Sequence, residues 1–326
     1  ETALMKVAII GAGAIGGYVA ARFAKSGNEV SVLLRGKNLE AVKSAGGLKL
    51  IEQDDTEYLA PVFATNKISE LGPQDLIILA VKSHQVIDVA AELPSIFTST
   101  TKIVTMQNGI PWWFFHGLEG YASTTIKSVD PDGSLSKYID PWRIIGSIVY
   151  PAAEVIAPGV VKVIEGNRFS LGEPSGRSDA LTEVSKIFAS AGFKAPISRD
   201  IRSEIMLKIF GNMSFNPISA LTHATLEDIC LDADTKTLVT AMMEEGLAIC
   251  NALNIQIPVS IEKRIAGAQA IGQHKTSMLQ DIESGRRIEL DALVAAMIEL
   301  GEATKVPTPY LRTIHTLTNL LAKTLE

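Results

Sequence analysis

Three polar side chains in the second half of this 326-residue chain have types and spacing suited to chemistry. Lys208, Asn212 and Asn216 follow one another at intervals of four residues, which places them on one face if a single helix carries them. Apolar residues surround this stripe, so we expect it to face an internal cleft; the alternative is an ordinary solvated face. A lysine in such a cleft loses hydration, and its lowered pKa makes it a usable proton donor.

A second group of polar residues lies between Lys275 and Asp291. Ser277 with Gln280 matches a helix capping box, and Glu289 fits the exposed acid at the start of an amphipathic helix. The competing interpretation is that the Ser277 hydroxyl and the Glu289 carboxylate line the cleft opposite Lys208. The residues alone leave both interpretations open.

The N-terminal segment indicates a dinucleotide site. An apolar strand from Lys6 runs into the pattern Gly-x-Gly-x-x-Gly, a helix follows up to Gly27, and a second strand covers residues 29–34. The first glycine permits a tight turn, the second leaves room for a pyrophosphate, and the third lets the helix pack closely on the strand. Phosphate would lie on the helix N-terminus. The predicted cofactor-binding residues of this turn are Gly11, Gly13, Ala14, Ile15 and Gly16.

The end of the second strand favours NADPH over NADH. An NAD-selective site places Asp or Glu there to hold the ribose 2′-hydroxyl, whereas a 2′-phosphate needs a cation. This chain has Arg35, followed by Lys37, and no acid before Glu40. The alternative is that Arg35 is an ordinary surface arginine.

Two further apolar runs, over residues 75–81 and 102–106, are typical of strands covered on both faces. Lys82 follows the first run and Asn108 follows the second. Ligands of doubly wound sheets bind at the carboxyl ends of the strands, so we expect both residues to line the cofactor site. Simple loop polarity is the competing explanation.

Composition excludes several classes of protein. A net charge of -6 without a basic cluster argues against nucleic-acid binding. No apolar run approaches the ~20 residues of a membrane span, and the N-terminus lacks a signal pattern, so we expect a cytoplasmic protein. Cys230 and Cys250 form no CxxC pair, the five histidines lack ligand spacing, and no metal site is expected.

Periodicity predicts an α/β protein of two domains. Strands over 148–150, 160–164 and 169–171 are expected to extend the first sheet, and long helical segments follow residue 198. We predict an NADP(H)-binding Rossmann-type domain over 1–199, with a doubly wound parallel sheet, and an all-helical substrate and catalytic domain over 200–326. The predicted helices cover 200–215, 226–253, 260–270, 288–303 and 308–324.

Taken in order, these pieces resemble the ketopantoate reductase (2-dehydropantoate 2-reductase) family from Lys6 to the C-terminal helices. The matching motifs are GAGAIGG at 11–17, Arg35, Lys82 in AVKSHQ, MQNGI at 106–110, Lys208-xxx-Asn212-xxx-Asn216-Pro217, and KTSMLQDIESGRRIELD at 275–291.

This resemblance implies that Lys208 is the general acid, that Glu289 binds the substrate hydroxyl, and that Ser277 helps to hold the substrate carboxylate. Asn212 and Asn216 would position the substrate, with Asn108 near both nicotinamide and substrate. The implied reaction is NADPH-dependent reduction of 2-dehydropantoate to (R)-pantoate, a step of pantothenate biosynthesis.

Two departures from the family pattern leave the substrate open. Ile288-Glu289-Leu290-Asp291 leads to Val294-Ala-Ala instead of the usual Asn-Gly, and MQNGI is followed by an aromatic segment, Pro111–Phe115. We expect this segment to tune the substrate range, although it could equally form core or a contact in a homodimer. The alternatives are a reductase of another bulky 2-keto acid and a non-catalytic NADP(H)-binding regulator.

Overall fold

The computed structural model describes residues 2–326 and divides the chain into two compact units. The first unit contains the residues up to Asn108 together with Ser134–Ile201, and the second contains Gly109–Gly133 and Arg202–Glu326. The sequence-based division had given residues 109–133 to the first domain. They group with the second unit because hydrogen bonds tie them to it, for instance from Ile110 N–H to the Ala292 carbonyl oxygen at 2.9 Å.

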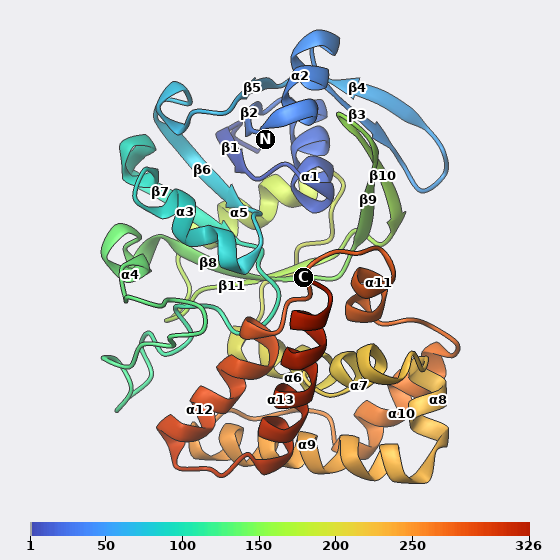
Figure 1. The fold of residues 1–326 in the computed structure, drawn as a ribbon. Coiled ribbons are helices and arrows are strands. Elements are labelled where there is room, and N and C mark those ends of the chain that lie inside the picture. Colours follow the sequence, from blue (N-terminus) through green and yellow to red (C-terminus); the bar gives the residue numbers. More distant parts are fainter. Residues whose placement is uncertain (1) are drawn as a thin grey trace. The chain divides into compact units, whose positions relative to one another are not determined.

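A seven-stranded sheet forms the centre of the first unit (Figure 1). Its order is β11-β8-β7-β6-β1-β2-β5, with β11 antiparallel to β8 and the other pairs parallel. The parallel part has the doubly wound order, and the predicted Rossmann-type sheet is confirmed. The strands are β1 (Lys6–Ile10), β2 (Glu29–Leu33), β5 (Phe63–Thr65), β6 (Gln74–Leu79), β7 (Phe97–Thr105), β8 (Ile144–Val149) and β11 (Phe169–Gly172).

A second, four-stranded sheet was missed by the sequence prediction. It has the order β4-β3-β10-β9, from β3 (Leu48–Ile51), β4 (Glu57–Ala60), β9 (Ala152–Ala157) and β10 (Val160–Glu165). The expectation that residues 160–164 extend the first sheet was therefore wrong. Val161 and Val163 of β10 are buried, whereas their neighbours are more exposed. This alternation is typical of a sheet covered on one face, not of a central strand in a two-sided sheet.

Helix α1 (Ala14–Lys25) contacts strands of both sheets. Its Gly17 lies so close to β10 that a Cβ would be 2.7 Å from Val161 Cγ2. An aromatic cluster joins α1 to α5 (Asp179–Ser190) and β11: Phe23 packs edge-to-face on Phe188, and Phe188 contacts Phe169 in a tilted arrangement. The remaining helices of this unit are α2 (Gly36–Ala45), α3 (Val86–Ala90), α4 (Leu135–Tyr138) and α5 (Asp179–Ser190).

The second unit is helical, as the periodicity predicts (Figure 1). Two of the predicted helices are shorter in the structure. The helix predicted over 200–215 ends at Asn212, and the helix predicted over 226–253 is divided at Asp232. The Asp232 side chain caps α9 by accepting a hydrogen bond from Thr235 N–H at 2.8 Å. The helices are α6 (Ile201–Asn212), α7 (Phe215–Thr222), α8 (Leu226–Leu231), α9 (Ala233–Ala252), α10 (Ile261–Ile271), α11 (Ser277–Glu283), α12 (Ala296–Thr304) and α13 (Pro309–Thr324). A short π-helix, Asp291–Ala295, precedes α12.

Candidate active site

The turn between β1 and α1 has the geometry that its glycines predict. Gly11 adopts a φ of 90°, a left-handed conformation that costs glycine little. A Cβ on Gly16 would lie 2.2 Å from the Gly11 carbonyl oxygen, so only hydrogen fits between helix and strand. A Cβ on Gly13, in contrast, would meet no described atom within 4 Å. The turn therefore leaves open space where a pyrophosphate would lie.

The start of α1 also suits an anion. The N–H groups of the first helical residues, among them Ala14 and Ile15, have no acceptor within the helix. The structure describes every residue of α1, and none in its first turn is acidic. Unpaired N–H groups and the helix dipole therefore act together in favour of a phosphate.

Gln107, two residues after the end of β7, holds the end of β6 and the residues after it, which pack on this turn. Its Nε2 donates to the carbonyl oxygens of Leu79 at 2.9 Å and Val81 at 2.8 Å. Val81 in turn packs on Gly11, where a Cβ would lie 2.6 Å from Val81 Cγ1. The Gln107 Oε1 is buried and has no hydrogen-bond partner within residues 2–326. Sequence reasoning missed Gln107, because a polar residue after a strand is a signal common to many loops.

Arg35 is exposed and forms the N-cap of α2 with an extended backbone. Lys37 is exposed in the first turn of this helix, and that turn contains no acidic residue. The segment after β2 therefore presents two exposed cations, Arg35 and Lys37, and no carboxylate before Glu40. This arrangement favours a phosphate over a neutral ribose hydroxyl.

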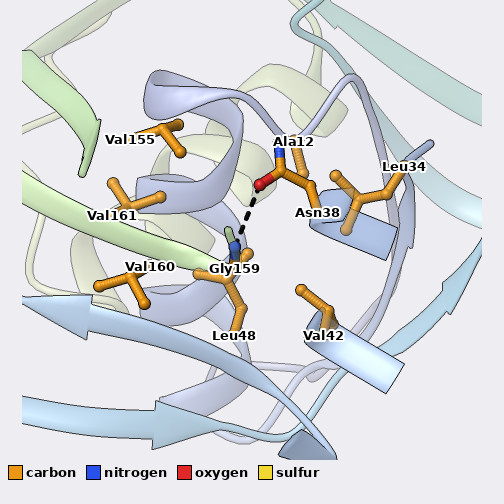
Figure 2. A pocket seen from close by; sticks show the side chains of 9 residues that line it. All are labelled: Ala12, Leu34, Asn38, Val42, Leu48, Val155, Gly159, Val160 and Val161. Atoms are coloured by element: carbon orange, nitrogen blue, oxygen red, sulfur yellow. Dashed lines mark hydrogen bonds between the residues drawn. The ribbon is translucent and has the colours of Figure 1, made fainter. Parts of the chain in front are cut away.

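A small hollow lies beside the glycine turn and the end of β2 (Figure 2). Ala12, Leu34 and Val161 are among its lining residues, and all three are buried. Asn38 contributes the polar atom that Figure 2 shows bonded across the hollow, its Oδ1 accepting from Gly159 N–H at 3.1 Å. The lining residues carry no charge, so this hollow offers no cation to a phosphate.

Lys82 and Asn108 both follow parallel strands at their carboxyl ends, as predicted. Lys82 is exposed, and its N–H donates to Gln85 Oε1 at 3.1 Å, which fixes the backbone where β6 ends. Asn108 is half-buried and is the last residue of the first unit before the chain enters the second.

The predicted stripe of Lys208, Asn212 and Asn216 does not lie on one helix. Lys208 and Asn212 belong to α6, which ends at Asn212, and Asn216 lies in the second position of α7. The break has a local cause: Pro217 has no N–H for the Met213 carbonyl, and its ring would clash with that group in a continuous helix. Ser214 completes the break, since its Oγ donates to the Phe210 carbonyl oxygen at 2.6 Å.

Lys208 and Glu289 of the second unit interact electrostatically. Lys208 is half-buried on α6, and Glu289 is half-buried in the irregular segment that follows α11. Burial lowers the pKa of Lys208 to about 8, while the Glu289 carboxylate opposes this shift by favouring the ammonium. Glu289 is therefore not the exposed acid of a helix start, and the structure brings it into the surroundings of Lys208.

Ser277 is not the helix cap that the capping-box interpretation predicts. The N-cap of α11 is Thr276, whose Oγ1 accepts from Leu279 N–H at 3.2 Å. Thr276 is buried and also shares a hydrogen bond with the Ser219 hydroxyl of α7. Ser277 is the first helical residue and is exposed. Its hydroxyl is consequently not required for capping.

The segment that carries Glu289 is joined to residues after Asn108. A Cβ on Gly109, which has a φ of 92°, would lie 2.5 Å from the Ala292 carbonyl oxygen. Ala292 belongs to the π-helix, a rare conformation that is frequent at functional sites. Because Gly109 follows Asn108 directly, the MQNGI motif and the Glu289 motif meet through backbone contacts that only glycine allows.

The aromatic segment Pro111–Phe115 is buried throughout, with Trp112 the most exposed of its four rings at 7%. A contact with another subunit through these rings is therefore not supported. Arg202 of α6 donates to the carbonyl oxygens of Phe114, at 2.7 Å from Nε, and of His116. The segment is thus anchored to the helix that carries Lys208.

Comparison with known proteins assigns both parts of the chain. Residues 7–176 match the family model "Ketopantoate reductase PanE/ApbA", and residues 200–322 match "Ketopantoate reductase PanE/ApbA C terminal". The chain belongs to the ketopantoate reductase family. This is a family of NAD(P)H-dependent reductases.

Relatives match over nearly their whole length. A 2-dehydropantoate 2-reductase from Mesorhizobium japonicum is 49% identical over 321 residues, which cover 98% of each chain. The crystal structure of a candidate ketopantoate reductase from Ralstonia solanacearum has a TM-score of 0.93 at 37% identity and covers 99% of each chain. A D-mandelate dehydrogenase solved with NADH and anilino(oxo)acetate, at 23% identity and a TM-score of 0.81 over 98% of this chain and 99% of that one, shares the fold.

Two further findings concern metals and membranes. Within residues 2–326, no group of three or more His, Cys, Asp or Glu side chains is arranged to hold a metal ion. Both cysteines are buried, and Cys230 Sγ lies 3.7 Å from the Ile265 carbonyl oxygen. None of the described helices is long and apolar enough to cross a membrane.

Proposed function

We propose that this chain reduces 2-dehydropantoate (ketopantoate) to (R)-pantoate with NADPH. The observation that carries the proposal is the 49% identity to a 2-dehydropantoate 2-reductase over 98% of both chains. The family's motif positions are filled in this sequence by Lys208, Asn212, Asn216, Ser277 and Glu289.

The first unit fits the cofactor. The open space over Gly13 and the acid-free start of α1 suit the pyrophosphate, while Arg35 and Lys37 suit the 2′-phosphate. Lys82, Gln107 and Asn108 would line the remainder of the site at the carboxyl ends of the strands. When bound, the reduced nicotinamide supplies a hydride to the substrate's C2 carbon.

Lys208 would donate the proton. As the hydride adds to C2, the keto oxygen becomes an alkoxide, and the Lys208 ammonium transfers a proton to that oxygen. Lys208 is left neutral and is reprotonated from solvent. A pKa of about 8 suits this role, because the lysine is mostly protonated at neutral pH and gives up its proton more readily than an ordinary lysine.

Glu289 and the neutral side chains would hold the substrate in place. Glu289 accepts a hydrogen bond from a substrate hydroxyl and keeps the Lys208 ammonium favourable. Ser277 donates to the substrate carboxylate, and the Asn212 and Asn216 amides position the substrate. Fixing the keto carbon at the correct distance and angle is itself a large part of such catalysis.

A reductase of another bulky 2-keto acid is the second candidate. The observation in its favour is the buried aromatic segment Pro111–Phe115, which is bound to α6 and to the π-helix of the catalytic unit. Such a segment would shape the space available to the substrate's side chain.

Steady-state kinetics separate these candidates. We expect ketopantoate with NADPH to give the highest kcat/KM in a panel of 2-keto acids that includes benzoylformate, tested with NADPH and NADH. A higher value with an aryl keto acid would support the second candidate. If no keto acid is reduced while NADPH still binds, the chain is a non-catalytic NADP(H)-binding protein.

A further inference from the structure

The indole N–H of Trp112 is a buried donor that has no acceptor among the residues the structure describes. Trp112 is 7% exposed, and its Nε1 has no hydrogen-bond partner within residues 2–326. An indole nitrogen can only donate, so no rearrangement of its own proton can satisfy it. Buried donors in native proteins almost always have partners, and one that lacks a partner requires an explanation.

The backbone holds Trp112 in a fixed position. Trp112 and Trp113 are the two central residues of a turn that is closed by Phe114 N–H donating to the Pro111 carbonyl oxygen at 3.1 Å. Phe115 packs edge-on against Phe114, with ring centroids 5.8 Å apart, and stacks on Tyr121. A donor on such a restrained turn is presented in one direction at little entropic cost.

The same turn is anchored to both elements that carry the proposed catalytic groups. On one side, Ile110 N–H donates to the carbonyl oxygen of Ala292, three residues after Glu289. On the other side, Arg202 holds the Phe114 carbonyl oxygen from α6 and lies about 9 Å along the helix axis from Lys208. All these contacts lie within the second unit.

We infer that Trp112 is a substrate-binding residue whose indole N–H donates to the carboxylate of the 2-keto acid. This inference rests on the proposed function in requiring a 2-keto acid, but not on which one. The keto oxygen takes the Lys208 proton, and Glu289 is itself an anion, so the carboxylate needs a hydrogen-bond donor other than these two residues. Trp112 supplies such a donor, alongside the exposed Ser277 hydroxyl.

Trp112→Phe tests this role, because it removes the N–H and keeps an aromatic ring. We expect KM for the keto acid to rise about tenfold, with kcat changed less than about threefold and the NADPH Kd unchanged. Trp142→Phe is the control, since it makes the same loss of ring size and of an indole N–H at a tryptophan outside the Pro111–Phe115 segment. An equal rise in KM for both variants, or no rise for Trp112→Phe, would overturn the inference.

NMR of the wild-type protein gives a test that does not depend on a variant's stability. The chain has three tryptophans and therefore three indole N–H signals, assigned from Trp113→Phe and Trp142→Phe. With NADP⁺ bound, we expect (R)-pantoate, and independently the keto-acid analogue oxamate, to move the Trp112 signal downfield. Movement with oxamate but not with pantoate would retain the inference and count against the proposed substrate. A Trp112 signal unmoved by the product of every keto acid that the enzyme reduces would exclude the hydrogen bond.

Discussion

The two units build their candidate sites by different means. In the first unit the glycine turn is made of backbone, and its fit depends on the absence of side chains at Gly11, Gly13 and Gly16. In the second unit the site depends on charged side chains, above all Lys208 and Glu289, that come from separate segments. The first kind of site is broken by added volume and the second by altered charge or hydration.

The two kinds of site affect the stability of the folded state differently. A backbone turn costs the fold little once glycine is present, because the close contacts are native packing. A half-buried lysine with a lowered pKa, in contrast, is held partly desolvated in the folded state and destabilises it. We therefore expect added volume at the packed glycines Gly11 and Gly16 to reduce stability, and loss of the Lys208 charge to reduce activity without reducing stability.

Lys208→Met should give the largest effect and test this separation most directly. Loss of the proton donor should lower kcat by roughly 10²–10⁴ with NADPH binding retained. The melting temperature at pH 7 should not fall and should rise slightly, because the cost of burying the ammonium disappears. Lys263→Met, at an exposed lysine of α10, is the control and should change neither quantity. A clear loss of stability in Lys208→Met would contradict the contrast.

The pH dependence follows from the same residue. The folded-state pKa of Lys208 is lowered from 10.5 to about 8, so the free enzyme loses its acid as pH rises through 8. We expect kcat/KM to fall about tenfold per pH unit well above that value. Because the unfolded chain binds the proton more tightly, the contribution of this group to stability should increase with pH between about 8 and 10.5. A kcat/KM that stays flat up to pH 10 would remove Lys208 as the acid.

Gly16→Ala and Gly13→Ala place the same methyl group at two ends of one turn. The Gly16 methyl meets the Gly11 carbonyl oxygen at 2.2 Å, and should cost about 2 kcal/mol or more in the free energy of unfolding. The Gly13 methyl enters open space, so the fold should tolerate it, but the NADPH Kd should rise about tenfold. Chemical denaturation and cofactor titration separate the two. Unchanged NADPH binding in a folded Gly13→Ala would argue against a pyrophosphate there.

Arg35→Ala tests the cofactor preference of the first unit. Loss of a charge-assisted contact to the 2′-phosphate should weaken NADPH binding by about 1.5–3 kcal/mol, with NADH binding nearly unchanged. Lys43→Ala, at an exposed lysine in the last turn of the same helix, is the matched control. Equal wild-type kcat/KM values for the two cofactors would be incompatible with the proposed NADPH preference.

Ser277→Ala and Thr276→Ala should give the smallest effects and separate binding from capping. Thr276→Ala removes the helix cap and should destabilise the protein by about 1 kcal/mol. Ser277→Ala should leave the melting temperature unchanged and raise the keto-acid KM a few fold. The NADPH Kd should not respond to either. Equal destabilisation by both variants would restore Ser277 to a structural role.

Structural features that depend on residues close together in the chain could be predicted from the sequence. The β1-turn-α1 unit, the parallel strands with polar ends and the helical second half follow from periodicity and from glycine positions a few residues apart. The break before Pro217 was also encoded locally, but the four-residue spacing of Lys208, Asn212 and Asn216 concealed it.

The contacts between segments that are distant in the sequence could be seen only in the tertiary structure. The second sheet pairs β3 with β10, residues 109–133 pack with the helical unit, and Glu289 reaches the surroundings of Lys208. The burial that lowers the Lys208 pKa, and that leaves the Trp112 N–H without a partner among residues 2–326, likewise depends on many neighbours distant in sequence. Residue type and spacing specify which groups can titrate or donate, whereas desolvation and pairing exist only once the chain has folded.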